Sequence, residues 1–213
     1  MTLGTMNSST LMTNEEFLED RRCALRESVE YFSAKNKPER ERWVCQEFIL
    51  NLGLAFDETE VITPDDEPPD VVFRDGWFEI KELLDHGRRR HAECKASLQK
   101  ALQATDPQDL LEQFTPQDIT PEQIGGRILK QLETLQDHYA PAARRNLDIL
   151  FYVNLQEHFL KVGPMPPAIE FAPYGWRSVS AIMGWGALVM FAASDATTFL
   201  VSNVGALIQR KFE

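Results

Sequence analysis

One segment of the chain, from Pro68 to Lys81, restricts the fold more than any other, because it has the pattern of a β-hairpin. It reads Pro-Pro-Asp-Val-Val-Phe-Arg-Asp-Gly-Trp-Phe-Glu-Ile-Lys. The Asp75-Gly76 pair stands between two runs of extended-type residues, and Asp-Gly in that position favours a type I′ turn. A two-residue turn there would place Phe73 opposite Phe78 and would fix the register of both strands.

The two faces of this hairpin differ in chemistry, because side chains alternate between the faces of a strand. One face is uniformly apolar and consists of Val71, Phe73, Phe78 and Ile80. The other face holds every charge on the two strands and consists of Asp70, Val72, Arg74, Trp77, Glu79 and Lys81. We therefore expect a buried apolar face, with the carboxyl groups of Asp70 and Glu79 close together on the opposite side.

Asp70, Glu79 and Lys81 are side chains suited to phosphodiester hydrolysis. As diagonal neighbours across the strands, Asp70 and Glu79 would have Cα atoms roughly 7–8 Å apart, close enough to share one ion. Mg²⁺ bonds to oxygen and usually takes one or two protein carboxylates, and its remaining positions go to water and substrate phosphate. Mg²⁺, or Mn²⁺ in its place, would lower the pKa of a bound water, and Lys81 would orient or activate that water and offset charge on phosphorus. The pattern predicts a metal-dependent phosphodiesterase.

Pro69-Asp70, eight intervening residues and Glu79-Ile80-Lys81 resemble the PD-(D/E)xK motif of the restriction-endonuclease-like nuclease superfamily. The resemblance implies an α/β fold, a mixed β-sheet flanked by helices. This chain would add an N-terminal helix and a basic helical segment inserted after the catalytic strand. It also implies endonuclease activity, with DNA as the expected substrate. More loosely, the whole chain resembles a bacterial family of uncharacterised proteins described as candidate endonucleases.

The resemblance also implies site residues on two helices. In this superfamily a glutamate on the helix before the sheet often supplies a further metal ligand or orients a metal-bound water. Glu47 is the candidate here, and the alternative is an exposed helix glutamate. A later helix often carries a Gln or Lys near the site, for which Lys130 and Gln131 are candidates. RecB-like members have a Gln four residues before a Tyr on this helix. The chain departs from that pattern, because the residue four positions before Tyr139 is Leu135.

The charge balance argues against nonspecific coating of nucleic acid. The net charge is -11 and the pI is about 4.9, whereas phosphate binding depends on lysine and arginine. Residues 86–104 are an exception, with five basic residues against Glu93 alone. A basic element after the catalytic strand would offset the repulsion between the metal-binding carboxylates and a polyanionic substrate. The alternative is that these residues form an ordinary solvated helix face. The candidate nucleic-acid-binding residues are Arg88, Arg89, Arg90, Lys95 and, on a later helix, Lys130.

Helices and strands are predicted on both sides of the hairpin. Thr13 begins a capping box for a helix to about Phe32, and Thr120 begins another for a helix to about Tyr139. Gly53 is placed to end a helix that starts near Pro38. Strands are predicted at residues 54–63, 148–154, 188–191 and 197–201, the last two as a hairpin, and residues 82–119 are predicted to be an insertion.

Length and composition support one domain, residues 13–213, after a disordered tail of residues 1–12. Cys23, Cys45 and Cys94 are odd in number and widely spaced, which favours free thiols in a reducing compartment. The chain shows no secretory signal pattern, and its longest apolar run, residues 187–193, is too short to span a bilayer. We therefore expect a cytoplasmic protein with no membrane partner, and a homodimer remains open.

Two other interpretations remain open. The chain could keep a nuclease fold and hold nucleic acid or a protein partner without cutting. Alternatively, the motif match is accidental, and Asp70, Glu79 and Lys81 lie on a solvent-facing sheet surface with an ion pair of little energetic value. The sequence does not separate the enzyme from the catalytically inactive binding module.

Overall fold

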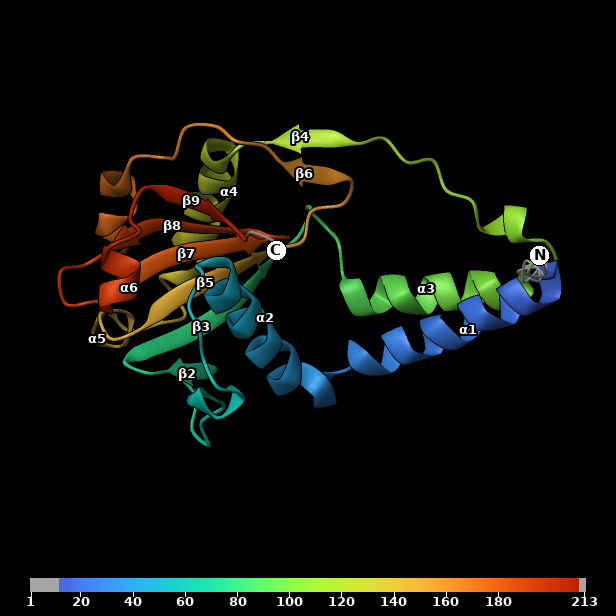
Figure 1. Ribbon diagram of the computed structural model, residues 1–213, viewed down its shortest axis with the longest axis horizontal. Coiled ribbons are helices and arrows are strands. Elements are labelled where there is room, and N and C mark those ends of the chain that lie inside the picture. The colour runs from blue at the N-terminus through green and yellow to red at the C-terminus, as the bar shows by residue number, and fades with distance from the viewer. Residues whose placement is uncertain (1–11, 211–213) are drawn as a thin grey trace, which may run out of the picture. The chain divides into compact units, whose positions relative to one another are not determined.

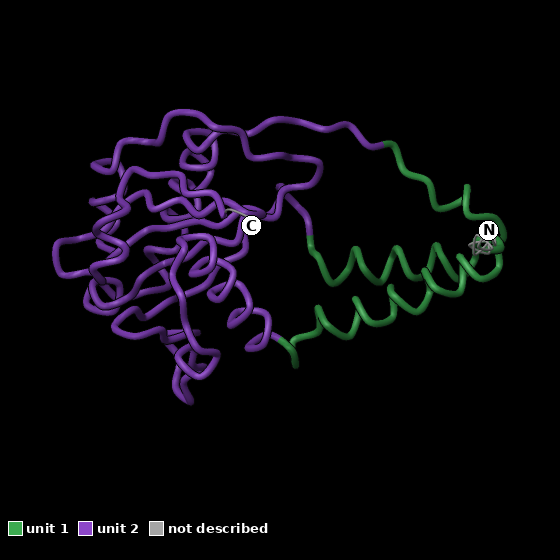
Figure 2. Tube along the Cα trace, in the orientation of Figure 1, with its two compact units in different colours: residues 1–36, 89–113 green, residues 37–88, 114–213 purple. Residues whose placement is uncertain are grey.

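The computed structural model describes residues 12–210 of the chain. Most of the predicted tail, residues 1–11, lies outside this range. The chain separates into two compact units, coloured in Figure 2. We call them the helical unit, Met1–Asn36 with Arg89–Gln113, and the sheet unit, Lys37–Arg88 with Phe114–Glu213. The prediction of a single domain stays a prediction, since a compact unit need not fold independently.

From residue 12 onward, the helical unit contains two α-helices and two 3₁₀ turns: α1 (Asn14–Tyr31), η1 (Ala34–Asn36), α3 (Arg90–Gln103) and η3 (Pro107–Leu110). Thr13 and Glu16 form the predicted capping box at the start of α1. The guanidinium of Arg22 donates hydrogen bonds of 3.0 Å to the carbonyls of Ala101 and Ala104, which join α1 to the end of α3. The predicted N-terminal helix and the predicted basic helix are both confirmed.

The sheet unit is built on a seven-stranded mixed sheet with the order β1-β2-β3-β5-β7-β8-β9. Its strands are β1 (Val61–Ile62), β2 (Val71–Phe73), β3 (Gly76–Leu83), β5 (Asp148–Val153), β7 (Ser178–Met183), β8 (Gly186–Ala192) and β9 (Ala206–Gln209). Strands β3, β5 and β7 are parallel, and the pairs toward both edges are antiparallel. Strands β4 (Gln117–Ile119) and β6 (His158–Leu160) form a separate parallel pair.

Helices α2 (Lys37–Asn51) and α4 (Pro121–Leu135) lie on opposite faces of this sheet (Figure 1). Phe48 and Ile49 of α2 pack into the same buried cluster as Phe78 and Ile80 of β3. On the other face, α4 places Ile124, Ile128 and Leu132 in a cluster with Leu83, Ile149 and Phe151. The expected α/β architecture, a mixed sheet flanked by helices, is therefore confirmed.

Short segments complete the sheet unit: η2 (Glu58–Glu60), α5 (Pro141–Arg144), η4 (Ala168–Glu170), η5 (Ala172–Tyr174) and α6 (Thr198–Val201). None of the helices in residues 12–210 is both long and apolar enough to cross a bilayer.

The hairpin forms with a register different from the predicted one. Phe73 pairs with Gly76 instead of Phe78, so the two-residue turn lies at Arg74-Asp75 and not at Asp75-Gly76. Arg74 adopts the left-handed conformation, with a φ of 52°. The prediction that an Asp-Gly turn sets the register was therefore wrong by two residues on β3.

The shift is an even number of residues, so it does not change which face of the sheet the apolar side chains of β2 and β3 occupy. The predicted apolar face is confirmed as buried: Val71, Phe73, Phe78 and Ile80. Gly76 belongs to β3 and meets a packing constraint. A Cβ atom added to it would lie 2.7 Å from Cε2 of Phe78.

Several strand predictions at the two ends of the sheet were wrong. Only Val61–Ile62 of the predicted strand 54–63 is extended. Residues 197–201 do not form a strand, because Thr198–Val201 is the short helix α6. The predicted strand at 188–191 is part of β8, whose partners β7 and β9 were not predicted.

The buried carboxylate of Asp148 holds the beginnings of three neighbouring strands together. It accepts hydrogen bonds from the Trp77 amide of β3 (3.0 Å), from the Ser178 hydroxyl of β7 (2.8 Å) and from Nε of Arg177 (3.1 Å). Asp148 itself pairs with Phe78, the residue before Glu79. This network fixes the part of β3 on which the candidate site is built.

Candidate active site

The two carboxylates predicted on the hairpin are buried and held by the backbone of β3. The exposed fraction is 3% for Asp70 and 4% for Glu79. Oδ2 of Asp70 accepts a hydrogen bond of 2.8 Å from the Ile80 amide, and the Asp70 amide donates to the Phe78 carbonyl at 3.0 Å. The strand pairing begins at Val71 opposite Phe78, so Asp70 lies just before β2. Asp70 therefore contacts β3 through Phe78 and Ile80, the residues on either side of Glu79.

Glu79 has two donors, and both reach the same oxygen. Nζ of Lys81 lies 2.5 Å from Oε1 of Glu79, and the hydroxyl of Tyr139 also donates to Oε1. Burial acts to lower the pKa of Lys81, but its hydrogen bonds with Glu79 and Tyr139 outweigh burial and raise that pKa. Burial, followed by the bond to Glu79, raises the pKa of Tyr139 to about 12. Lys81 is therefore a cation and Tyr139 a neutral donor at neutral pH.

Asp70 has a cationic partner that the sequence did not reveal. Lys37, the first residue of α2, places its Nζ 3.1 Å from Oδ1 of Asp70. The same Nζ lies 3.3 Å from Oε1 of Glu41 and 3.2 Å from Oε1 of Glu67. Burial acts to lower the pKa of Lys37, but its bonds with Asp70 and the nearby carboxylates raise it overall. Helix α2 thus supplies an ammonium group to three carboxylates.

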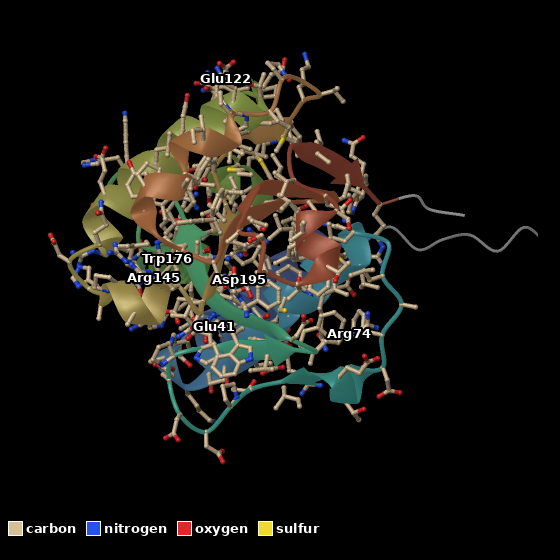
Figure 3. All side chains as sticks on the ribbon, turned by 90° about the vertical axis from the view of Figure 1, so that its left-hand side faces the viewer. Glu41, Arg74, Glu122, Arg145, Trp176 and Asp195 are labelled. Carbon is tan, nitrogen blue, oxygen red and sulfur yellow. The ribbon has the colours of Figure 1, made fainter. Side chains whose placement is uncertain are left out.

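The helix glutamate that shares Lys37 with Asp70 is Glu41, whereas the predicted Glu47 has a different partner. Glu47 is half-buried and pairs with Arg210, which follows β9, at 3.3 Å. Glu41, labelled in Figure 3, is buried and lies beside Lys37. Burial and then the charge of Asp70 raise the pKa of Glu41 to about 7. We therefore replace Glu47 by Glu41 in the candidate site.

Helical periodicity could have distinguished these two glutamates. Glu41 lies four positions before Cys45 and seven before Phe48, so it shares their side of the helix. Cys45 and Phe48 are fully buried against the sheet, so that side faces the core. Glu47 lies off this stripe.

The candidates on α4 do not join the site, because Lys130 and Gln131 are exposed. Tyr139, which follows α4, makes the contact with Glu79 instead. Leu135 precedes Tyr139 where the RecB-like pattern has Gln, so the sequence pattern did not point to this tyrosine.

The predicted nucleic-acid-binding residues divide into engaged and exposed groups. Nη1 of Arg88 donates to the Asn154 carbonyl at 2.9 Å, and Arg90 stacks on the ring of Phe32 at 3.9 Å. The exposed group is Arg89, Lys95 and Lys130. Arg88 and Lys130 belong to the sheet unit, and the other three belong to the helical unit.

The donor set at the hairpin fits a hard divalent cation. Within residues 12–210, no group of three His, Cys, Asp or Glu side chains converges as a ready-made metal centre. Mg²⁺ needs only one or two protein carboxylates, however, and Asp70 and Glu79 supply two buried ones. Two buried acids also require positive charge nearby, and Lys37 and Lys81 supply part of it. The residues present therefore fit the ion that the motif implies.

Together, the fold and this site define a mixed α/β protein with two buried carboxylates and a lysine on an antiparallel hairpin. The chain belongs to the family described as "Putative endonuclease, protein of unknown function (DUF1780)", which matches residues 13–212. It is also similar to a solved structure of a protein of unknown function from Pseudomonas aeruginosa strain PAO1, described as belonging to the monooxygenase superfamily. The two share 27% identity over 97% of each chain, with a TM-score of 0.64. A search of curated proteins finds no match.

Proposed function

We propose that this protein is a Mg²⁺-dependent endonuclease with a restriction-endonuclease-like fold, acting on DNA. One observation carries the proposal: Asp70, just before β2, and Glu79 of β3 are both buried, Asp70 bonds to the residues on either side of Glu79, and Lys81 contacts Glu79. With η2, the α3–β4 segment after β3 and α5 after α4 set aside, the order α2, β1, β2, β3, α4, β5 agrees with the helix, three strands, helix and strand of that nuclease core. The family's description as an endonuclease supports a nucleic-acid substrate at a coarser level.

In this proposal each residue of the site has a separate role. Asp70 and Glu79 hold the ion, which when bound acts as a Lewis acid toward the phosphate and its attacking water. Lys81 contacts Glu79 and would orient or activate the attacking water and offset charge that develops on the phosphate. Tyr139 keeps the carboxylate of Glu79 in one orientation.

The monooxygenase description of the Pseudomonas protein belongs to that protein, and the side chains of the present site favour hydrolysis. Oxygen activation by a metal centre typically uses histidine ligands or a mixed histidine and carboxylate set. The groups that converge here are carboxylates and lysines, which suit a hard cation and a phosphate. A nuclease fold that binds without cutting is the second candidate, and the same experiments separate it.

A thermal unfolding experiment tests the metal site. Mg²⁺ or Mn²⁺ should raise the melting temperature of the wild type, because an ion that binds only the folded state stabilises it. Asp70→Asn and Glu79→Gln should abolish this shift. Asp65→Asn is the matched control, since this exposed loop acid offers adventitious binding only. Equal shifts in all four proteins would contradict the site.

A cleavage experiment tests catalysis. With Mg²⁺ or Mn²⁺, the protein should cut a member of a panel of duplex, single-stranded and branched DNA and RNA. Lys81→Met should lose cutting while it keeps most of its affinity. If wild type and Lys81→Met bind equally and neither cuts, the binding module replaces the enzyme.

Binding should depend on the exposed basic residues. Arg89→Gln and Lys95→Gln together should weaken binding to all sequences and flatten its salt dependence, by a slope of roughly 0.9 for each duplex-DNA phosphate that the variant no longer neutralises. These residues are more informative than Arg88 and Arg90, which have intramolecular partners. Unchanged affinity for nucleic acid would show that the basic segment does not contribute to binding.

A further inference from the structure

The ammonium group of Lys37 lies within hydrogen-bond distance of three carboxylates at once. Its distances are 3.1 Å to Asp70, 3.2 Å to Glu67 and 3.3 Å to Glu41. A lysine ammonium has three N–H donors and no acceptor, so these contacts match its full donor capacity. We call Asp70, Glu41 and Glu67 the acidic cluster.

The acidic cluster needs a cation on the side of Asp70 away from β3. Oδ2 of Asp70 is held by the Ile80 amide, which leaves Oδ1 facing Lys37. Asp70 and Glu41 are buried, whereas Glu67 is exposed and Lys37 is half-exposed. Lys37 therefore reaches the cluster from the solvent side and places one positive charge beside two buried acids.

Two-metal phosphodiesterases place two ions about 3.5–4 Å apart, joined by a shared carboxylate. In this chain a second ion would have to share Asp70 and use Glu41 or Glu67. Those are the oxygens that the Lys37 ammonium contacts. A divalent ion bound to Oδ1 at about 2.0–2.1 Å would compete with a cation tethered by its own side chain.

We propose that the ammonium of Lys37 takes the place of a second divalent cation, so that the site binds one ion, at Asp70 and Glu79. This inference rests on the proposed function, because it concerns the ions of the same site. Helix α2 then contributes a fixed positive charge to the site instead of a metal ligand.

Counting bound Mn²⁺ tests the proposal without any cleavage assay. The spectroscopic signal of free Mn²⁺ is measured by electron paramagnetic resonance during a titration of the full chain. The wild type should bind one ion per chain at the site, and Lys37→Met should bind two. Lys37→Arg should keep one, since it retains a charge. Lys35→Met is the matched control, because Lys35 pairs with Glu30, outside the acidic cluster, at 3.7 Å.

The second ion in Lys37→Met should depend on the acidic cluster. The double variant Lys37→Met with Glu41→Gln should return to one ion. If Lys37→Met does not fold, Lys37→Gln keeps an uncharged donor near Asp70 and should also bind two ions. The proposal is overturned if a folded variant with an uncharged residue at position 37 binds only one ion. It is also overturned if the wild type binds two ions and Asp70→Asn loses both.

Failure of the underlying metal site gives a different result. If the ion count of the wild type does not change in Glu79→Gln, the proposed site at Asp70 and Glu79 is wrong. A gain of one ion in Lys37→Met that Glu41→Gln removes would still support the role of Lys37.

Discussion

The hydroxyl of Tyr139 donates a hydrogen bond to Oε1 of Glu79, a residue 60 positions earlier in the chain. Tyr139 follows α4, so this bond brings the helix on one face of the sheet to the charged face of the hairpin. The ring of Tyr139 also packs against buried Trp176, with centroids 5.1 Å apart, and Figure 3 labels this tryptophan. The orientation of Glu79 therefore depends on packing between two residues that are distant from the hairpin in the sequence.

Tyr139→Phe should slow cleavage by about 10- to 100-fold, the usual effect of removing an outer-shell partner of a metal ligand. It should cost only about 1 kcal/mol of unfolding free energy, because the ring packing remains. Single-turnover cleavage and thermal unfolding measure the two effects. Tyr174→Phe is the control, since it removes a hydroxyl elsewhere in the sheet unit. If Tyr139→Phe cleaves at the wild-type rate, the hydroxyl of Tyr139 has no role in cleavage.

Glu41 should make stability fall with rising pH. Its folded pKa of about 7 lies above the unfolded value near 4.5, so the folded state binds more protons between these values. The stabilisation is present below the unfolded pKa and is lost as the pH rises toward 7 and above, on the order of 3 kcal/mol in total. Urea unfolding from pH 4.5 to 8 should show this decline in the wild type and a smaller one in Glu41→Gln. If the unfolding free energies of the wild type and Glu41→Gln change with pH in the same way, this prediction is contradicted.

Asp148→Ala should cost about 3–5 kcal/mol, because it leaves the guanidinium of Arg177 without its buried partner. Asp118→Ala is the matched control: Asp118 also pairs with a cation, Lys161, but both side chains are exposed, so the loss should be below about 1 kcal/mol. Chemical denaturation of both variants provides the comparison. Similar losses would mean that the Asp148 network does not hold the sheet together.

Arg144→Met should raise stability. Arg144 is buried, and its Nε and Nη1 have no hydrogen-bond partner within residues 12–210. Removal of an unsatisfied buried group of this kind should gain about 1 kcal/mol or more. The exposed neighbour Arg145 is the control, and Arg145→Met should change stability by less than about 0.5 kcal/mol. Destabilisation of Arg144→Met alone would show that the guanidinium has a partner in solution.

The hairpin shows which part of the site could be predicted from sequence. Alternation of side chains depends only on the strand period, so the buried apolar face was predicted correctly. The register depends on the turn, and here Arg74 takes the left-handed conformation while Gly76 packs under the ring of Phe78. Those are tertiary effects that an Asp-Gly pair does not encode.

The remaining site residues lie beyond what local patterns contain. Lys37 reaches Asp70 from 33 positions away, and no spacing rule joins them. Glu41 is different, because its helical spacing to Cys45 and Phe48 marks the buried side. Strand β7 was missed because its small residues, such as Ser178 and Ser180, do not give a strong strand pattern, although both are fully buried.

Lys37 is also the residue at which the chain passes from the helical unit into the sheet unit. A truncated protein that starts at residue 37 would carry a free α-ammonium on the same residue whose side chain holds Asp70. A truncated protein that starts at Ala34 would retain η1 and keep that terminal charge three residues away. Truncations that remove α1 should therefore begin before η1, so that their metal affinity can be compared with that of the full chain.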